Sequence, residues 1–267
     1  MNKRELVSAI QQKKSYLCIG LDTDITKLPK HLLGKPDAVA DFNKAIIDAT
    51  KDFCVAYKIN TAFYEAQGLQ GWQAMEETLH YIPKTHFTIA DAKRGDIGNT
   101  SAQYAKTFFE TLPFDSVTVA PYMGADSVKP FLEYENKVTI VLGLTSNIGA
   151  EDFELQKLQG GKPLYESVLE QTASWGTPDN LMFVVGATQA KALQHIRQIV
   201  PNHFLLVPGV GAQGGSLKDV SHYGLNDECG LLINASRAVI FASDKEGFAE
   251  QAGIVAKSYH DEMKEFL

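Results

Sequence analysis

Short apolar segments rich in β-branched residues recur along the chain, and each is followed by a stretch with apolar residues at helical spacing. That alternation is typical of βα units around a parallel sheet. Nearly continuous apolar runs, such as LMFVV at 181–185, suit strands buried on both faces, whereas an antiparallel sandwich would alternate more cleanly. The pattern predicts eight strands, at 16–22, 54–60, 86–91, 116–122, 138–144, 181–187, 204–209 and 230–234.

Helical periodicity lies between and after these strands. It predicts helices at 37–50, 71–81, 101–112, 126–134, 164–175, 190–199 and 248–266. Eight βα units in 267 residues favour a single α/β domain over 1–267, a (β/α)8 TIM barrel, since such barrels have about 250 residues. A leading helix near 4–12 is expected to close the barrel bottom. An open, doubly wound sheet built from the same units remains the alternative.

The widest gap between strand starts follows the fifth strand. Residues 146–161 form a largely polar stretch that is interrupted by Gly149, Gly160 and Gly161. Long loops at the edge of a compact barrel commonly cover its active site. We therefore expect a lid insertion here.

Charge and composition exclude several classes of function. The formal net charge of −7 disfavours a nucleic-acid partner, which would require a basic face, but it leaves room for a small anionic ligand. The three cysteines, Cys18, Cys54 and Cys229, have no metal-binding or paired spacing and are expected to be core thiols in a reducing cytosol. No leader-like segment and no long apolar run is present, so we expect a cytoplasmic protein with no membrane partner.

Polar residues collect where the predicted strands end. In a (β/α)8 barrel the active site lies at the carboxyl ends of the strands. Any one of these residues alone would be an ordinary solvated strand end, but a set with both charge signs indicates a site. The set comprises Asp22, Lys58, Asn60, Asp91, Lys93, Ser146, Ser236 and Arg237.

The densest cluster is DAKRGDIGNT at 91–100. Asp91 and Lys93 are two residues apart at a strand end, so their side chains leave the same face and can pair. If Lys58 enters from the neighbouring strand and Asp96 from the following loop, two lysines and two aspartates form an alternating array. Such pairing is how a water-poor site tolerates four charges. A purely structural salt-bridge network is the alternative.

A second cluster is PGVGAQGG at 208–215, followed one unit later by Ser236 and Arg237. Glycines let backbone N–H groups approach an anion, and the loops after the seventh and eighth strands commonly bind phosphate in these barrels. Arg237 would add a planar, doubly donating contact. The glycines alone would also fit a plain turn-rich loop, but the arginine on the adjacent unit favours phosphate binding.

Taken together, these motifs resemble the orotidine 5′-phosphate decarboxylase family, in particular its longer bacterial subgroup. The resemblance extends from Asp22 to Arg237 and includes YKIN at 57–60 and NASR at 234–237. The Asp-x-Lys-x-x-Asp pattern alone also occurs in metal-dependent sugar-phosphate enzymes of the surrounding superfamily. Its combination with the glycine-rich phosphate motif is what singles out the decarboxylases.

The resemblance implies a cofactor-free, metal-free conversion of orotidine 5′-monophosphate (OMP) to uridine 5′-monophosphate (UMP) and carbon dioxide, the last step of de novo UMP synthesis. It also implies a homodimer with shared active sites. Asp96, Ile97 and Thr100 would reach into the partner's site, whereas the lysines and Asp91 would act in the same chain as the phosphate loop.

The resemblance also implies a role for each matching residue. Asp22 and Thr100 would bind ribose hydroxyls, and Lys58 would hold both the charge array and the ribose. Ser146 would read the pyrimidine edge, although its loop, TSNIG at 145–149, differs from that of the shorter enzymes. Gln213 and Arg237 would hold the phosphate. Further substrate contacts are expected from Asn60, Pro208, Gly211 and Gly214.

The proposed chemistry concentrates on Lys93. Loss of carbon dioxide leaves an electron pair in the ring plane, where no conjugated sink accepts it, so a fixed ammonium would stabilise the carbanion and then protonate it. Asp91 would repel the substrate carboxylate in the ground state. Two rivals remain: a magnesium-dependent lyase or aldolase acting on a sugar phosphate, and a catalytically silent barrel that binds a nucleotide monophosphate.

Overall fold

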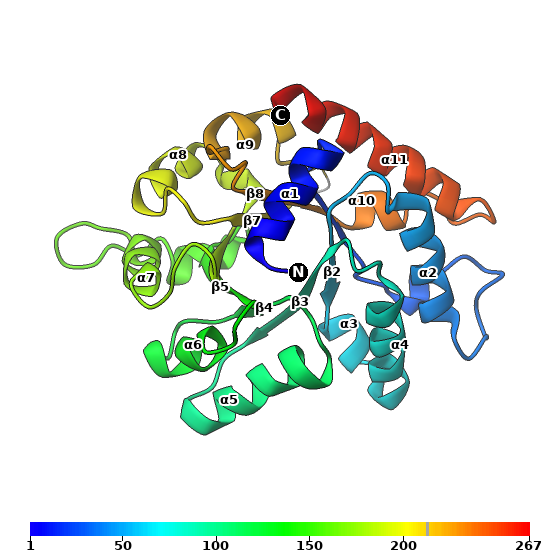
Figure 1. Ribbon diagram of the computed structural model, residues 1–267, viewed down its shortest axis with the longest axis horizontal. Coiled ribbons are helices and arrows are strands. Elements are labelled where there is room, and N and C mark those ends of the chain that lie inside the picture. The colour runs from blue at the N-terminus through cyan, green and yellow to red at the C-terminus, as the bar shows by residue number, and fades with distance from the viewer. Residues whose placement is uncertain (212–213) are drawn as a thin grey trace.

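Eight parallel strands close into a barrel in chain order in the computed structural model, which describes residues 1–211 and 214–267 (Figure 1). Each strand pairs with the next, and β8 pairs with β1. The predicted (β/α)8 barrel is therefore confirmed, and the open sheet is excluded. The strands are β1 (Leu17–Gly20), β2 (Ala56–Asn60), β3 (Phe87–Arg94), β4 (Ser116–Val119), β5 (Val138–Leu144), β6 (Leu181–Val185), β7 (Leu205–Pro208) and β8 (Leu231–Ala235).

Helices surround the barrel as an outer ring. The larger ones are α2 (Ala38–Thr50), α4 (Gly68–Tyr81), α5 (Gly98–Lys106), α6 (Ala125–Leu132), α7 (Leu164–Ala173), α8 (Ala190–Ile199), α9 (Leu217–Gly224) and α11 (Phe248–Met263). Two single-turn helices, α3 (Ala62–Glu65) and α10 (Arg237–Ile240), follow β2 and β8. None of the helices in the described part of the chain is long and apolar enough to span a membrane.

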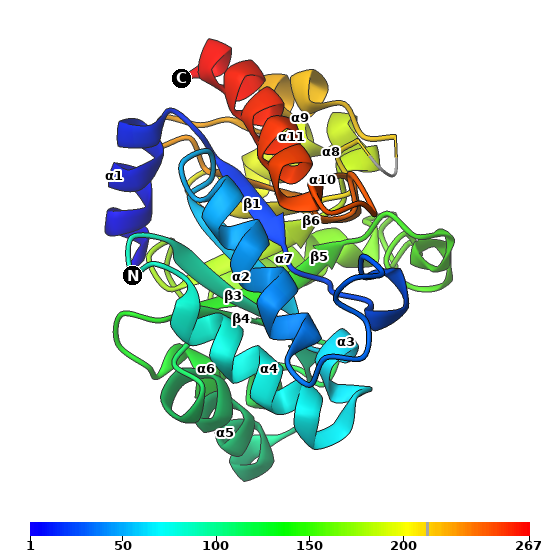
Figure 2. The same cartoon turned by 90° about the vertical axis from the view of Figure 1, so that its right-hand side faces the viewer.

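The leading helix α1 (Lys3–Lys13) lies across one end of the barrel (Figures 1 and 2). Asn2 caps it by accepting a hydrogen bond from the amide of Glu5, whose carboxylate accepts one from the Asn2 amide in return. Leu6 and Ile10 are buried on its inner face. The loops after β1 and β5 lie at the opposite, open end, which α1 does not cover (Figure 2).

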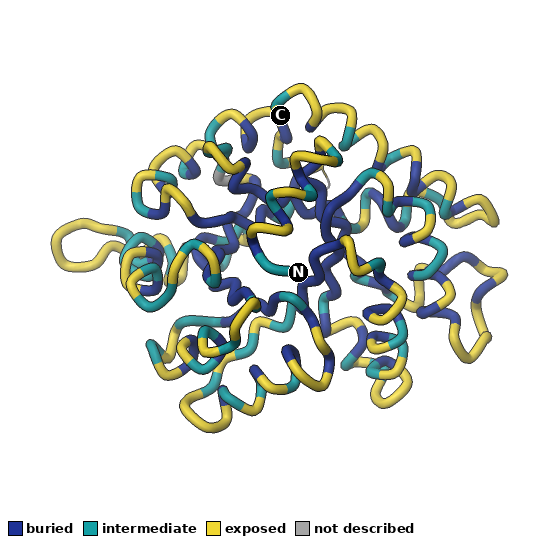
Figure 3. Tube along the Cα trace, in the orientation of Figure 1, coloured by how far each residue is buried: buried dark blue, intermediate teal, exposed yellow. Residues whose placement is uncertain are grey.

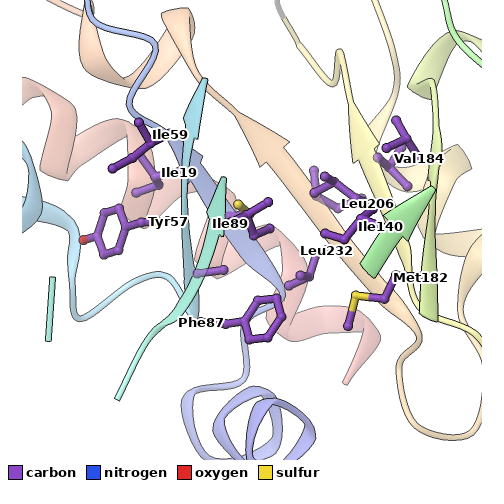
Figure 4. Packing of buried hydrophobic residues seen from close by; sticks show 14 of the residues in the cluster. Ile19, Tyr57, Ile59, Phe87, Ile89, Ile140, Met182, Val184, Leu206 and Leu232 are labelled. Carbon is purple, nitrogen blue, oxygen red and sulfur yellow. The ribbon is translucent and has the colours of Figure 1, made fainter. Parts of the chain in front are cut away.

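The strands form the buried centre of the molecule, as Figure 3 shows. Ile140, Leu206 and Leu232 point toward one another inside the barrel (Figure 4). Tyr57 points outward and bonds to α2 through the Thr50 hydroxyl, at 2.9 Å. Side chains in a strand alternate between faces, so residues two apart share a face. Polar residues near the strand ends therefore stand above an apolar floor.

Some boundaries differ from the sequence prediction. Strand β3 continues to residue 94 rather than ending at 91, and β4 ends at 119 rather than 122. The helix expected at 101–112 begins at 98 and ends in a wider π-type turn at Thr107–Thr111. Helices α3, α9 and α10 were not predicted. All three cysteines are buried and unpaired, as expected.

Candidate active site

Four charged side chains form a continuous chain of ion pairs at the open end of the barrel. The Lys58 ammonium lies 3.0 Å from the Asp22 carboxylate and 2.9 Å from that of Asp91. Asp91 in turn lies 2.6 Å from the Lys93 ammonium. Lys58 belongs to β2, and Asp91 and Lys93 belong to β3, whereas Asp22 lies two residues beyond the end of β1. The three strands are neighbours, since Gly20 aligns with Lys58 and Asn60 aligns with Asp91. The order Asp22, Lys58, Asp91, Lys93 alternates in sign, which lets each charge stabilise its neighbours.

Burial differs along this array. The Lys58 side chain is only 4% exposed, whereas that of Lys93 is 48% exposed. Burial alone would lower the pKa of Lys58, but the two aspartates outweigh it and raise that pKa above its usual value. Burial likewise opposes ionisation of Asp91, yet Lys58 and Lys93 hold its pKa well below the usual range. Lys58 and Asp91 therefore stay charged, and Lys93 is the accessible cation at the end of the chain.

An irregularity in β3 directs Lys93 toward the cavity. Strand β3 advances from Ala90 to Arg94 while its partner β4 advances only from Val117 to Val119, so β3 bulges between those points. Bulges are frequent beside active sites because they redirect side chains. Within the bulge Lys93 has a φ of +46°, in the left-handed region that residues with a Cβ rarely adopt. Such strain persists only where neighbouring contacts enforce it.

The contacts that hold the bulge come from the neighbouring strand β4 and from the surrounding helices. The Thr118 hydroxyl of β4 accepts a hydrogen bond from the Lys93 amide, at 2.9 Å, and donates one to Asp91, at 3.0 Å. The next residue, Arg94, pairs with Glu65 of α3 and lies over the rings of Tyr104 and Phe108. Both ends of the bulge are therefore fixed.

Asp96 is not part of the array in this chain. Its carboxylate accepts a hydrogen bond from the adjacent Ile97 amide, at 2.8 Å, and among the described residues it pairs with no lysine. Asp22 provides the second carboxylate instead. Ile97 is 56% exposed, and Thr100, in the first turn of α5, is exposed as well. In this chain Ile97 and Thr100 are therefore exposed, while Asp96 is half-buried.

A cavity of about 260 Å³ opens beside the array. Its wall continues from the charged residues to β7 and β8, where Arg237 begins α10. Arg237 is exposed, and no described carboxylate pairs with it. The cavity thus has a free cation at one side and the array at the other. Its lining comprises Asp22, Lys58, Asn60, Asp91, Lys93, Val184, Leu206, Pro208, Gly209, Val210, Asn234, Ser236 and Arg237.

The glycine-rich segment after β7 folds back on itself. The amides of Gly211, Gly214 and Gly215 donate to carbonyls of the same segment, so in this conformation they are not free for an anion. Gly211 has a φ of +76°, and a Cβ there would lie 2.4 Å from the Tyr259 hydroxyl, which explains why glycine occupies it. Gln213, expected to hold phosphate, lies outside the described residues, as does Ala212.

A second cavity, of about 420 Å³, adjoins the first where Lys93, Val184 and Pro208 line both. Its other walls are Leu142 and the segment that follows β5, including Ser146. Lys93 therefore lies at the junction of a polar cavity and a more apolar one. That arrangement suits a ligand with an anionic end and a flat ring.

Two further residues support the array. Thr118, which sequence reasoning missed, bridges Asp91 and the Lys93 amide. Ser236 was expected at this end of the barrel but without a role in the array, and its hydroxyl lies 2.8 Å from the Asp22 carboxylate and 3.0 Å from the Gly20 carbonyl. Thr118 lies within the strand motif SVTV and carries no signal of its own.

The sequence that forms this site matches one family of known proteins. Residues 15–252 match the family model described as "Orotidine 5'-phosphate decarboxylase / HUMPS family". The chain belongs to this family. An orotidine 5′-phosphate decarboxylase of Phocaeicola vulgatus is 57% identical over 270 aligned positions, covering 100% of this chain and 99% of the relative. One from Christiangramia forsetii is 58% identical over 266 positions, covering 98% and 97%.

Solved structures agree with this family assignment. The structure of Leishmania donovani OMP decarboxylase is 35% identical, with a TM-score of 0.82, and the alignment covers 98% of this chain and 99% of that one. The family resemblance inferred from the motifs is thereby confirmed. Because the match covers nearly all of both chains, it includes the whole barrel and every strand end that contributes to the site.

Proposed function

We propose that this protein decarboxylates OMP to UMP and carbon dioxide without a cofactor, as the last step of de novo UMP synthesis. The observation that carries the proposal is the Asp22–Lys58–Asp91–Lys93 array, which ends in an accessible ammonium beside a cavity with a free arginine. Family membership and the names of the similar proteins support the same reaction. Buried, unpaired cysteines fit a cytoplasmic location for this metabolic enzyme.

The two cavities suggest how the nucleotide lies. The phosphate would meet Arg237 and the loop after β7, including Pro208, Gly211, Gly214 and Gln213. The ribose would contact Asp22, Lys58 and Asn60 in the first cavity, and the pyrimidine would enter the second cavity near Ser146. This placement brings the ring past Lys93, since that residue borders both cavities.

Lys93 would carry the chemical step. When the bond between the ring and the carboxylate breaks, carbon dioxide leaves and the electron pair stays on the ring carbon in the ring plane. The ammonium would stabilise that charge and donate a proton to the carbon, and the resulting amine would regain a proton from solvent. The Thr118 contact and the bulge in β3 fix Lys93 in advance, which is what electrostatic stabilisation requires.

Asp91 would contribute in a different way. Its low pKa keeps it ionised, so the substrate carboxylate would enter next to a negative charge. That repulsion falls as neutral carbon dioxide forms, which lowers the barrier relative to the bound substrate. Binding energy from the remote phosphate would offset the repulsion.

The site would be completed by a second copy of the chain. Asp96 has no lysine partner among the described residues, and its neighbour Ile97 is exposed. The loop after β4 lies close to the same turn, since a Cβ on Gly95 would be 3.6 Å from the Met123 side chain, and Tyr122 and Met123 in that loop are 85% and 48% exposed. Apolar side chains exposed together are typical of protein interfaces. In a homodimer Asp96, Ile97 and Thr100 would extend into the partner's cavity and add a third carboxylate to the two lysines.

The rival within the superfamily is a magnesium-dependent enzyme acting on a sugar phosphate. Magnesium prefers several carboxylate or carbonyl oxygens, but here both carboxylates of the array are already bonded to lysines and hydroxyls. The pairing favours the nucleotide reaction. A silent nucleotide-binding barrel would need the phosphate site but no accessible Lys93.

The deciding experiment follows the ultraviolet absorbance of OMP mixed with the wild-type protein in excess chelator, and again with added magnesium. We expect the OMP signal to disappear at the same rate in both. Turnover only with magnesium, or none with OMP but activity on a sugar phosphate, would establish the rival. Tight UMP binding without turnover would establish the silent barrel.

A further inference from the structure

The segment between β5 and α7 holds the wall of the second cavity through one acidic side chain. After a 3-10 turn at Ile148–Asp152, the chain makes a narrow hairpin in which Lys157 pairs with Pro163, and it returns to α7. Glu154 lies between the turn and the hairpin. Its backbone carbonyl accepts a hydrogen bond from the Tyr165 amide at 2.9 Å, which ties this point of the segment to α7.

The Glu154 carboxylate reaches the end of β5. One oxygen accepts a hydrogen bond from the Thr145 amide at 2.6 Å, and the other lies 2.9 Å from the Thr145 hydroxyl. Hydrogen bonds to an ionised acceptor are stronger than those between neutral groups. Among the described residues no cation pairs with Glu154, so its polar contacts are directed at Thr145. The segment therefore fixes the first residue beyond the strand.

Ser146, the residue after Thr145, is enclosed by the backbone that follows β6. Gly186, which follows β6, donates from its amide to the Leu144 carbonyl at 2.8 Å. A Cβ on Gly186 would lie 2.7 Å from the Ser146 Cβ and 2.8 Å from its amide nitrogen, so the two backbones are in close contact. Ser146 is thus held between Gly186 and the Thr145 anchor while it lines the second cavity.

We propose that Glu154 is a positioning residue for recognition of the pyrimidine: its carboxylate fixes Thr145 and thereby sets Ser146 against the cavity that receives the base. This inference rests on the proposed function, because it takes the second cavity as the base site. In this positioning role Glu154 itself does not contact the substrate. It acts through the backbone of 145–147, and it leaves the phosphate and ribose contacts untouched.

The test compares two ligands that differ only in the base. Calorimetry would measure the affinity of UMP and of ribose 5-phosphate for wild type, Glu154→Ala and Glu154→Gln. Glutamine keeps an oxygen for the Thr145 amide and can donate to its hydroxyl, so it should rescue. Glu151→Ala is the matched control, since Glu151 is an exposed acid in the same segment.

We expect Glu154→Ala to weaken UMP binding about tenfold and ribose 5-phosphate binding less than twofold, by analogy with the loss of one charge-assisted contact. Glu154→Gln and Glu151→Ala should stay within about threefold of wild type for both ligands. Amide hydrogen exchange should accelerate at Thr145 in Glu154→Ala but not at Ile140 in the middle of β5, which would show that the variant is folded and the change is local.

Equal weakening of both ligands, or unchanged UMP binding, would overturn the positioning role. Wild type that binds the two ligands equally would overturn it as well, because the second cavity would then not read the base. Failure of the proposed function would give a different result, because the wild-type protein itself would then leave OMP unconverted.

Discussion

The hydroxyl of Thr118 accepts a hydrogen bond from the backbone amide of Lys93 at 2.9 Å, and so holds a lysine whose φ of +46° would otherwise be unfavourable. The same hydroxyl donates to Asp91 at 3.0 Å. Thr118 is fully buried and lines neither of the two cavities of the candidate site. Its contribution would therefore be to place the two reacting groups rather than to touch the substrate.

Replacing Thr118 tests this relationship. Thr118→Val keeps the shape of the side chain but removes both hydrogen bonds, and we expect kcat to fall roughly tenfold or more, since hydrogen bonds to charged groups contribute about 1.5–3 kcal/mol. UMP affinity should change little. Thr118→Ser, which retains the hydroxyl, is the control and should keep most of the activity. Unchanged kcat in the valine variant would refute the positioning role.

Arg237 should matter only for a phosphorylated substrate. For Arg237→Ala we expect kcat/KM for OMP to fall by about 100-fold or more, because binding energy at the phosphate supports the reaction at the ring. The bare nucleoside orotidine should lose much less. Arg237→Lys keeps the charge but not the doubly donating geometry and should lie in between. Equal losses for both substrates would argue against a phosphate contact.

Mixed dimers test whether Asp96 acts in the partner's site. Lys93→Ala and Asp96→Ala should each be nearly inactive. Mixing them by unfolding and refolding should restore about one quarter of wild-type activity, because about half of the dimers are mixed and each has one intact site of two. Lys93→Ala mixed with Lys58→Ala is the control and should restore nothing. No recovery in the first mixture would place Asp96 outside the partner's site.

Acid stability should depend on His203. Burial, with Lys3 and Arg197 nearby, lowers the pKa of His203 to about 4, and neither ring nitrogen has a hydrogen-bond partner among the described residues. The unfolded chain takes up a proton near pH 6.5 and the folded chain does not, so stability falls as the pH drops from 6.5 toward 4.

His203→Phe removes this proton uptake while keeping the ring that packs against Phe183. Between pH 7 and pH 5, denaturant unfolding should show that the variant loses less stability than wild type, by on the order of 1 to 2 kcal/mol. His222→Gln, at an exposed position, is the control. Parallel losses in wild type and His203→Phe would show that His203 does not contribute.

The eight strands could be predicted because most of them contain a short run of buried, mainly apolar residues, which is the pattern of a parallel strand covered by helices. The charged residues at their ends followed from the same prediction. Helix α9 was missed because it follows the glycine-rich segment directly, although Ser216 caps it by accepting from the Asp219 amide. Its eight residues make only about two turns, which is too short a stretch for helical periodicity to stand out in the sequence.

The partners within the array could not be predicted in the same way. The spacing placed Asp96 in an array with the lysines, whereas the resemblance placed it in the partner's site. Within this chain Asp22 supplies the second carboxylate, because β1 lies next to β2. The bulge in β3 depends on its register with β4, a long-range relationship that no local pattern encodes. Thr118 acquires its role only through that bulge.

The most direct test of the account is single-turnover and steady-state decarboxylation of OMP by Lys93→Ala in the presence of a chelator, with UMP affinity measured on the same sample. Lys106→Ala, at an exposed position on α5, is the control. We predict that Lys93→Ala loses turnover by at least about a thousandfold yet still binds UMP, because the lysine acts on the carbanion rather than on the bound nucleotide. Near-normal turnover by this variant would contradict the account.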